Sequence, residues 1–113
     1  MGQYHKIYNI DKKEMIHPHN IDNGLKQYEQ VGWIGSSSTA LFALLCNSNC
    51  RGGGDFPEHA FLGRWAGDRI VIQGDYAEPT DQAYIEFSEE ENEGFINISN
   101  EIISLLETIE RSY

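Results

Sequence analysis

The chain has 113 residues, 40% of them hydrophobic and 12% aromatic, which is the size and composition of one globular domain. Its formal net charge of −10 at pH 7 disfavours direct binding to nucleic acid, whose phosphates attract basic surfaces. No apolar run approaches the about 18 residues of a membrane-spanning helix, and the first residues lack a signal-peptide pattern. We therefore expect one cytoplasmic domain with no membrane partner.

The N-terminal part of the chain predicts a β-hairpin. Residues 4–10 alternate around aromatic and β-branched side chains, residues 11–13 are a polar turn, and residues 14–17 return as a second strand. Pro18 has no amide hydrogen to donate to a ladder, so this strand ends there or lies at an edge.

A buried helix is predicted over residues 40–46, which are apolar on every side of a helical turn. The hydroxyl groups of residues 36–39 are N-cap candidates ahead of it, and the glycines at 52–54 are its stop signal. A short helix of at most two turns is predicted earlier, over residues 25–30.

A second hairpin and two further strands are predicted next. Residues 61–66 and 69–73 predict a second hairpin around Gly67 and Asp68, in which residues 70–72 form a central strand buried on both faces. Residues 83–87 alternate as another strand, and residues 95–98 are a short last strand.

The chain closes with a helix that Ser99 or Asn100 caps. Its apolar residues follow the i, i+3, i+4, i+7 spacing of an amphipathic helix, and they are Ile102, Leu105, Leu106 and Ile109. The predicted fold class is α+β, as a single domain over residues 1–113. It combines a mainly antiparallel sheet with a buried central helix and a C-terminal amphipathic helix.

The acidic residues are concentrated in the C-terminal part of the chain. Residues 1–69 carry seven basic and seven acidic side chains, whereas residues 70–113 carry eleven acidic side chains against Arg111 alone. The whole net charge of −10 therefore arises after residue 69. A field of one sign attracts basic protein surfaces, and the alternative is an acidic face that only keeps the chain soluble.

The candidate partner-binding residues come from this acidic part and from nearby aromatic residues. The glutamates are Glu86, Glu89, Glu90, Glu91 and Glu93. Trp65 and Tyr76 are candidate anchors, because Trp and Tyr are enriched at interface hot spots. The alternative for Trp65 is a place in the core, since tryptophan is highly buried on average.

A second candidate site is a zinc centre formed by His17, His19, Cys46 and Cys50. Histidines at i and i+2 of an extended segment point to the same side, and cysteines at i and i+4 lie one helical turn apart. Together they predict the closed Cys2His2 set that structural zinc prefers. The alternatives are a partial site that borrows Asp55 or His59, and core cysteines with surface histidines that bind no metal.

The glycines at 52–54, which follow Arg51, suggest phosphate binding but fit none of its specific patterns. The loop also follows a helix, whereas phosphate loops precede one. Asp55 and His59 beside a cysteine could form a thiol-based catalytic set, or with the glycines a metal-dependent hydrolase, although neither spacing matches a family signature.

Four stretches within the first 76 residues resemble a small protein family of bacteria and prophages that has no assigned activity. They are Met1–Tyr4, Ile16–His19, Arg51–Asp55 and Trp65–Val71. The resemblance implies a one-domain fold and no chemistry. In general type, a small acidic single-domain chain also resembles the phage-encoded anti-CRISPR inhibitors, which occupy basic clefts of RNA-guided nucleases.

The leading hypothesis is an inhibitor or adaptor that presents its acidic surface over residues 75–110 to a basic nucleic-acid-binding protein, most concretely a CRISPR nuclease. The alternatives are a small metal-dependent nucleotide or phosphoester hydrolase, and an acidic housekeeping protein with no catalytic function.

Overall fold

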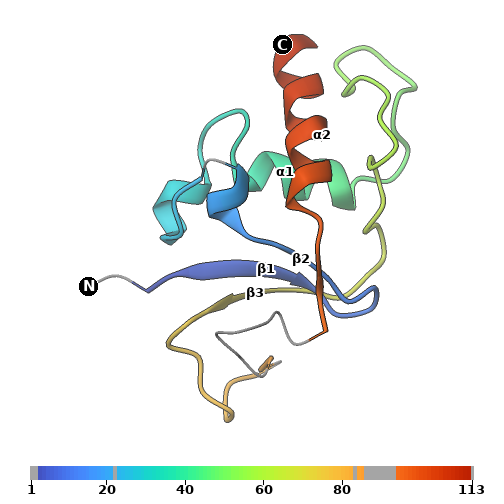
Figure 1. Cartoon of the computed structure of the whole chain (residues 1–113). Helices are drawn as coiled ribbons and strands as arrows, with labels where there is room; N and C mark the ends of the chain where they lie inside the picture. The colour runs from blue at the N-terminus through green and yellow to red at the C-terminus, as the bar shows by residue number, and fades with distance from the viewer. Residues whose placement is uncertain (1–2, 22, 83, 86–93, 113) are drawn as a thin grey trace.

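The structure is a computed structural model that describes residues 3–21, 23–82, 84–85 and 94–112 (Figure 1). Its elements, in chain order, are β1 (His5–Asn9), β2 (Glu14–Ile16), the 3-10 helices η1 (Pro18–Ile21) and η2 (Gln27–Gln30), α1 (Ser37–Leu45), β3 (Ile70–Gly74), β4 (Ile96–Asn97) and α2 (Ser99–Ser112). One hydrophobic core joins residues of the sheet, of both α-helices and of the loops between them. No helix in the described part of the chain is both long and apolar enough to cross a membrane.

The four strands form one sheet in the order β3-β1-β2-β4. β1 pairs antiparallel with both neighbours, so that Ile7 lies opposite Ile16 on β2 and opposite Ile72 on β3. β2 pairs parallel with the short β4. The α+β fold class and the N-terminal hairpin are confirmed, and the sheet is mixed but mostly antiparallel.

Different parts of the chain cover the two faces of the sheet (Figure 1). Ile7 and Ile16 point toward α1 and α2 and belong to the core. Tyr8 and Met15 alternate to the opposite face, where the Phe95 ring lies edge-on against Tyr8 with centroids 5.2 Å apart. Burial raises the pKa of Tyr8 to about 12, because the phenolate would lose its hydration there.

The helix α2 buries one side against the core, as its spacing predicts. The buried residues of this side are Ile102, Leu105, Leu106 and Ile109. Each such aliphatic side chain stabilises the fold by roughly 1.5–3 kcal/mol when fully buried. The Oγ atom of Ser99 accepts a hydrogen bond of 3.0 Å from the amide of His17, which ties the first turn of α2 to the end of β2.

The helix α1 begins where the hydroxyl groups predict it. The Oγ atom of Ser36 accepts a hydrogen bond from the amide of Thr39, which caps the first turn. The helix ends at Leu45, well before the glycines at 52–54. It is also not buried all round as predicted, because Phe42 on its outer side is 66% exposed.

The predicted second hairpin does not form. Residues 61–67 follow turns, because the amides of Gly63 and Trp65 each donate a 2.9 Å hydrogen bond to carbonyl groups in the last turn of α1. These amides are therefore not available to a strand. β3 pairs with β1 instead and is the outermost strand, so the prediction of a central strand buried on both faces is wrong: Ile72 is 52% exposed.

The strand predicted over residues 83–87 lies mostly outside the described residues, and Tyr84 and Ile85 are not in a strand. The side chain of Gln73 holds the backbone of Ile85 by two hydrogen bonds of 2.7 Å, one to its carbonyl and one from its amide. The last predicted strand is present as the two-residue β4.

Candidate functional site

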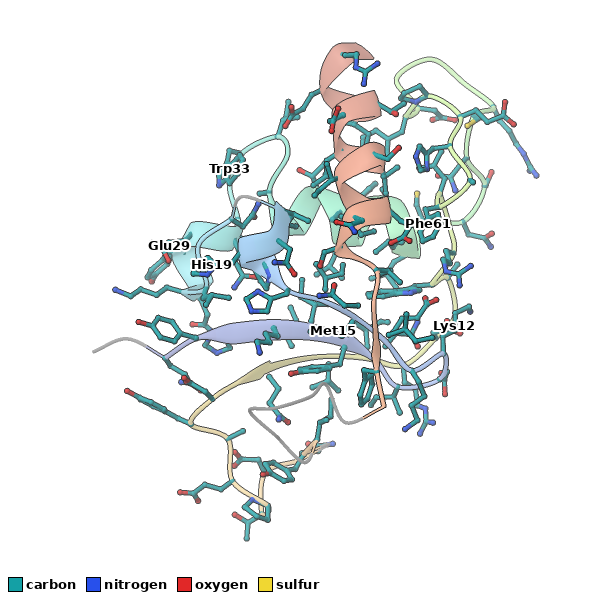
Figure 2. The ribbon with its side chains drawn as sticks, viewed as in Figure 1. Lys12, Met15, His19, Glu29, Trp33 and Phe61 are labelled. Carbon is teal, nitrogen blue, oxygen red and sulfur yellow. The ribbon has the colours of Figure 1, made fainter. Side chains whose placement is uncertain are left out.

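Three ion pairs fasten the turn of the N-terminal hairpin to the residues that precede β3. The pairs are Asp11–Arg69, Lys12–Asp68 and Glu14–Arg64, and we call this set the hairpin clamp. Figure 2 shows Lys12 at the hairpin end of the sheet. Because β3 begins at the next residue, Ile70, the clamp fixes where β3 starts beside β1.

Glu14 is the buried member of the hairpin clamp, with 4% of its surface exposed. Its Oε1 atom accepts hydrogen bonds from the indole Nε1 of Trp65 at 2.7 Å and from the Nε of Arg64 at 3.1 Å. Burial by itself would raise the pKa of Glu14, but the hydrogen bonds from Arg64 and Trp65 outweigh it and hold the pKa below its ordinary value. The carboxylate is therefore charged and fully engaged within the fold.

The two outer pairs of the hairpin clamp are more exposed to solvent. A hydrogen bond from the Asn9 side chain and a second from Lys12 lower the pKa of Asp68. Hydrogen bonds from the side chain and the amide of Arg69 lower the pKa of Asp11. Exposed pairs of this kind contribute little to stability individually, but they neutralise the charge of the hairpin turn.

The described acidic residues after β3 fall into two groups on opposite sides of the sheet (Figure 1). Asp75, Glu78 and Asp81 lie in residues 75–81, which we call the acidic segment, and the second group is on α2. The α2 group comprises Glu101, Glu107 and Glu110, and all six side chains are exposed. The single acidic surface predicted over residues 75–110 is thus divided in the part that the structure describes.

Local hydrogen bonds shape the acidic segment. The carboxylate of Asp75 accepts a 3.0 Å hydrogen bond from the amide of Tyr4, and that of Asp81 accepts a 2.9 Å hydrogen bond from the amide of Glu78. None of the four ion pairs found among the described residues includes a residue of the acidic segment. Its carboxylates are therefore exposed and take part in none of the described ion pairs.

The structure separates the predicted partner-binding residues. Tyr76 is in the acidic segment and is 60% exposed. Trp65 is in the core with no exposed surface, so its indole cannot anchor a partner while the fold is intact. The predicted glutamates lie outside the described residues, and they are Glu86, Glu89, Glu90, Glu91 and Glu93.

The four predicted zinc ligands are not brought together. The rings of His17 and His19 stack with centroids 5.9 Å apart, as their spacing suggests. Cys46 follows the end of α1, and the thiol of Cys50 is 3.5 Å from the carbonyl oxygen of Phe56. In this view His19 lies across the molecule from the Phe61 loop, which packs on the end of α1 (Figure 2).

The described residues contain no group of three or more His, Cys, Asp or Glu side chains placed to hold a metal ion. The zinc site stays a prediction that metal analysis of the purified protein tests.

The residues of the predicted hydrolase are engaged in local structure. The carboxylate of Asp55 accepts hydrogen bonds of 2.7 and 3.0 Å from the amides of Arg51 and Gly52, which lower its pKa. The Nδ1 atom of His59 accepts a 3.1 Å hydrogen bond from the amide of Phe61, and its Nε2 lies 3.1 Å from the Ser104 hydroxyl. In neutral His59 the proton is therefore on Nε2, so this nitrogen cannot take a proton from Ser104.

Comparison of the chain with protein-family models, with curated proteins and with solved structures gives no match in any of the three. The resemblance to a bacterial and prophage family therefore stays a prediction.

Sequence reasoning missed a group of exposed apolar side chains in η2 and in the loop between η2 and α1. Tyr28 is 93% exposed, Val31 50% and Trp33 46%, and Figure 2 shows Trp33 at the outside of this loop. The only prediction for this part of the chain is the short helix over residues 25–30. The signal was the pair of aromatic residues Tyr28 and Trp33 in a short, glycine-containing stretch of sequence, because Trp and Tyr outside a core are enriched at interfaces.

Proposed function

We propose that this protein is a non-catalytic binding protein that places its acidic segment on a basic surface of a nucleic-acid-handling protein, as an inhibitor or adaptor. The observation that supports the proposal is the exposed negative charge of Asp75, Glu78 and Asp81. All three are exposed, and none belongs to an ion pair among the described residues. The acidic residues of the hairpin clamp, by contrast, are paired with bases.

The physical basis is electrostatic complementarity. Carboxylates on an ordered scaffold can occupy a cleft that otherwise binds phosphates, and a field of one sign speeds the encounter. The acidic segment begins where β3 ends, and the hairpin clamp fixes where β3 begins. An RNA-guided nuclease, which holds its heteroduplex in a positively charged channel, is the most concrete partner of this class.

The test compares two variants with the same change in charge at different places. The first is Asp75→Lys, Glu78→Lys and Asp81→Lys in one chain. The second carries the matched reversals on α2, namely Glu101→Lys, Glu107→Lys and Glu110→Lys. Binding is measured by biolayer interferometry against a purified RNA-guided nuclease and against basic nucleic-acid-binding proteins captured from host lysate.

We expect the first variant to bind at least about tenfold more weakly, because three favourable charge interactions become repulsive. The α2 variant should stay within about threefold of the wild type. Binding should also weaken between 50 and 300 mM salt, since the Debye length falls across this range. Equal effects of the two variants, or binding that ignores both reversals and salt, would refute the proposal.

A further inference from the structure

We infer that the outer edge of β3 is a docking site for an extended, basic segment of a partner protein, which adds to the sheet as a further strand. The inference rests on the proposed function for the charge of the ligand. It adds the place of binding and a backbone mode of recognition, in which main-chain hydrogen bonds supply affinity and pockets for alternate side chains supply specificity.

The hydrogen-bond pattern shows which backbone groups of β3 face outward. The amide of Ile10 donates to the carbonyl of Arg69, and the amide of Asp75 donates to the carbonyl of Tyr4, each at 2.9 Å. These two pairs bracket the β1–β3 ladder and belong to its register. Hydrogen-bonded and non-hydrogen-bonded pairs alternate in an antiparallel ladder.

It follows that Val71 and Gln73 turn their amide and carbonyl groups toward β1, whereas Ile70 and Ile72 turn theirs outward. No hydrogen bond to these outward groups is present among the described residues. Proteins usually blunt such an edge with charged side chains, proline or a bulge. Here the outermost strand presents Ile72 with 52% of its surface exposed.

Two cavities adjoin this edge, and Ile72 lines both. The smaller one, of about 90 Å³, is on the helix side of the sheet, where Ile7, Val31 and Leu41 contribute its apolar wall. It is smaller than the roughly 150 Å³ that admits a benzene ring, so it suits one aliphatic side chain. A strand residue placed opposite Ile72 would direct its side chain to this helix side.

The second cavity, of about 380 Å³, lies along the C-terminal half of β3 and reaches the acidic segment at Tyr76 and Asp81. His5 also lines it, is 8% exposed, and has a buried Nδ1 atom without a hydrogen-bond partner in the described structure. Buried polar groups in native proteins are nearly always hydrogen-bonded. His5 is on β1 and lies opposite Gly74 at the C-terminal end of β3, so its Nδ1 atom is a candidate partner for a polar group of the ligand at this end of the edge.

The negative charge beside the edge indicates that the segment it binds is basic. Asp75, Glu78 and Asp81 follow β3 directly and lie on the side of the sheet opposite the helices (Figure 1). A segment that alternates apolar and basic residues would place its apolar side chains toward the smaller cavity and its basic side chains toward these carboxylates. A second copy of this chain would instead bring two acidic segments together, which like-charge repulsion opposes.

The probe is a seven-residue peptide of alternating lysine and valine, acetylated and amidated at its ends. Binding to the full-length protein is followed by calorimetry, by amide chemical shifts, and by hydrogen exchange at Ile70 and Ile72. Two further peptides carry N-methyl groups on all valines or on all lysines. Ile72→Thr tests the edge, and Ile96→Thr, at a 63% exposed isoleucine on the opposite edge strand, is its matched control.

We expect a dissociation constant of about 1 mM or tighter. With peptide at about ten times this constant, the Ile72 amide should exchange about tenfold more slowly, because only the unbound fraction exchanges. One methylated peptide should lose binding and the other should keep it, because alternate amides of an added strand point to opposite edges. Loss with methylated valines indicates antiparallel addition, and loss with methylated lysines indicates parallel addition. Ile72→Thr should weaken binding about fivefold through lost apolar burial, and Ile96→Thr should not.

Three results would overturn the edge site. They are no binding at millimolar peptide, equal loss with both methylated peptides, or a concentration-dependent dimer that protects Ile72 without peptide. Binding that the Asp75, Glu78 and Asp81 reversals abolish while Ile72 stays unprotected would leave the proposed function standing and reject the edge. Slower hydrogen exchange at Ile72 with peptide, if it persists in that variant and in high salt, would support the docking site at the edge and reject the electrostatic function.

Discussion

The hairpin clamp makes a quantitative prediction for the substitution Glu14→Gln. Glutamine keeps the shape of the side chain and one oxygen that can accept the hydrogen bond from Trp65. Its amide group, however, faces the guanidinium of Arg64 with donors instead of an acceptor. The substitution therefore removes the hydrogen bonds from Arg64 to Oε2 and the negative charge of the acceptor, while it keeps the oxygen that accepts from Trp65 and from the Nε of Arg64 and leaves the packing of the core almost unchanged.

The expected loss of unfolding free energy is about 1.5–3 kcal/mol, the range for hydrogen bonds to a charged group. It stays below the 3–5 kcal/mol that follows when a fully buried pair is broken. The reason is that the Arg64 side chain is 39% exposed and can be hydrated in the variant. For a domain of this length, about 4 °C of melting temperature per kcal/mol gives a decrease of roughly 6–12 °C.

Urea unfolding followed by circular dichroism at pH 7 measures this loss, with Asp11→Asn in an exposed clamp pair as the control that should shift stability less. The pH dependence is a second readout. Because the folded-state pKa of Glu14 is below its ordinary value, the stabilisation is complete above about pH 4.5 and is lost as pH falls through the folded-state pKa. The difference in unfolding free energy between wild type and Glu14→Gln should therefore decrease in acid. A difference that is small at pH 7, or that stays constant down to pH 3, would refute this account of Glu14.

Two other predictions concern pH and backbone geometry. Burial, with further contributions from Lys6 and His19, lowers the pKa of His17. The unfolded chain therefore binds a proton at His17 more tightly than the folded chain does. His17 should not affect the free energy of unfolding above about pH 6.5, and it should lower this free energy as the pH decreases below that value. Thermal melting in EDTA buffer should show a smaller decrease in acid for His17→Gln. Gly63→Ala should cost about 2–3 kcal/mol in chemical denaturation, because Gly63 has φ +73° and an added Cβ would lie 2.9 Å from the carbonyl oxygen just after α1. Gly67→Ala, at φ +83° in open space, carries only the conformational cost of about 1–2 kcal/mol, and equal losses for the two glycines would contradict the close approach.

The elements that the sequence predicts correctly are those with a local cause. The N-terminal hairpin follows from alternation and a polar turn, and α2 follows from the spacing of its four buried residues. Ser36 is a correct N-cap because its hydroxyl needs only the amide three residues later. The negative charge of the acidic segment could also be predicted, because its acidic residues are read directly from the sequence.

The features that the sequence did not predict depend on contacts between distant residues. The spacing of residues 61–73 suits a hairpin, but the amides of Gly63 and Trp65 reach the end of α1 about twenty residues earlier. The apolar run of residues 70–72 cannot show whether a strand is central or outermost, because that depends on its partners. The edge and its cavities were missed for the same reason, as both require the β1–β3 register.

The exposed edge of β3 and the buried position of Trp65 have one common origin. A strand over residues 61–66 would have paired with β3 and covered its outward amide and carbonyl groups. Those residues instead cap the last turn of α1, which brings the indole of Trp65 to Glu14 in the core. The hairpin clamp then starts β3 directly after this loop, beside β1 and without a described neighbour on its other side. The contacts that complete the core are therefore the same contacts that leave Ile70 and Ile72 unpaired among the described residues, and this is why we place the docking site at this edge.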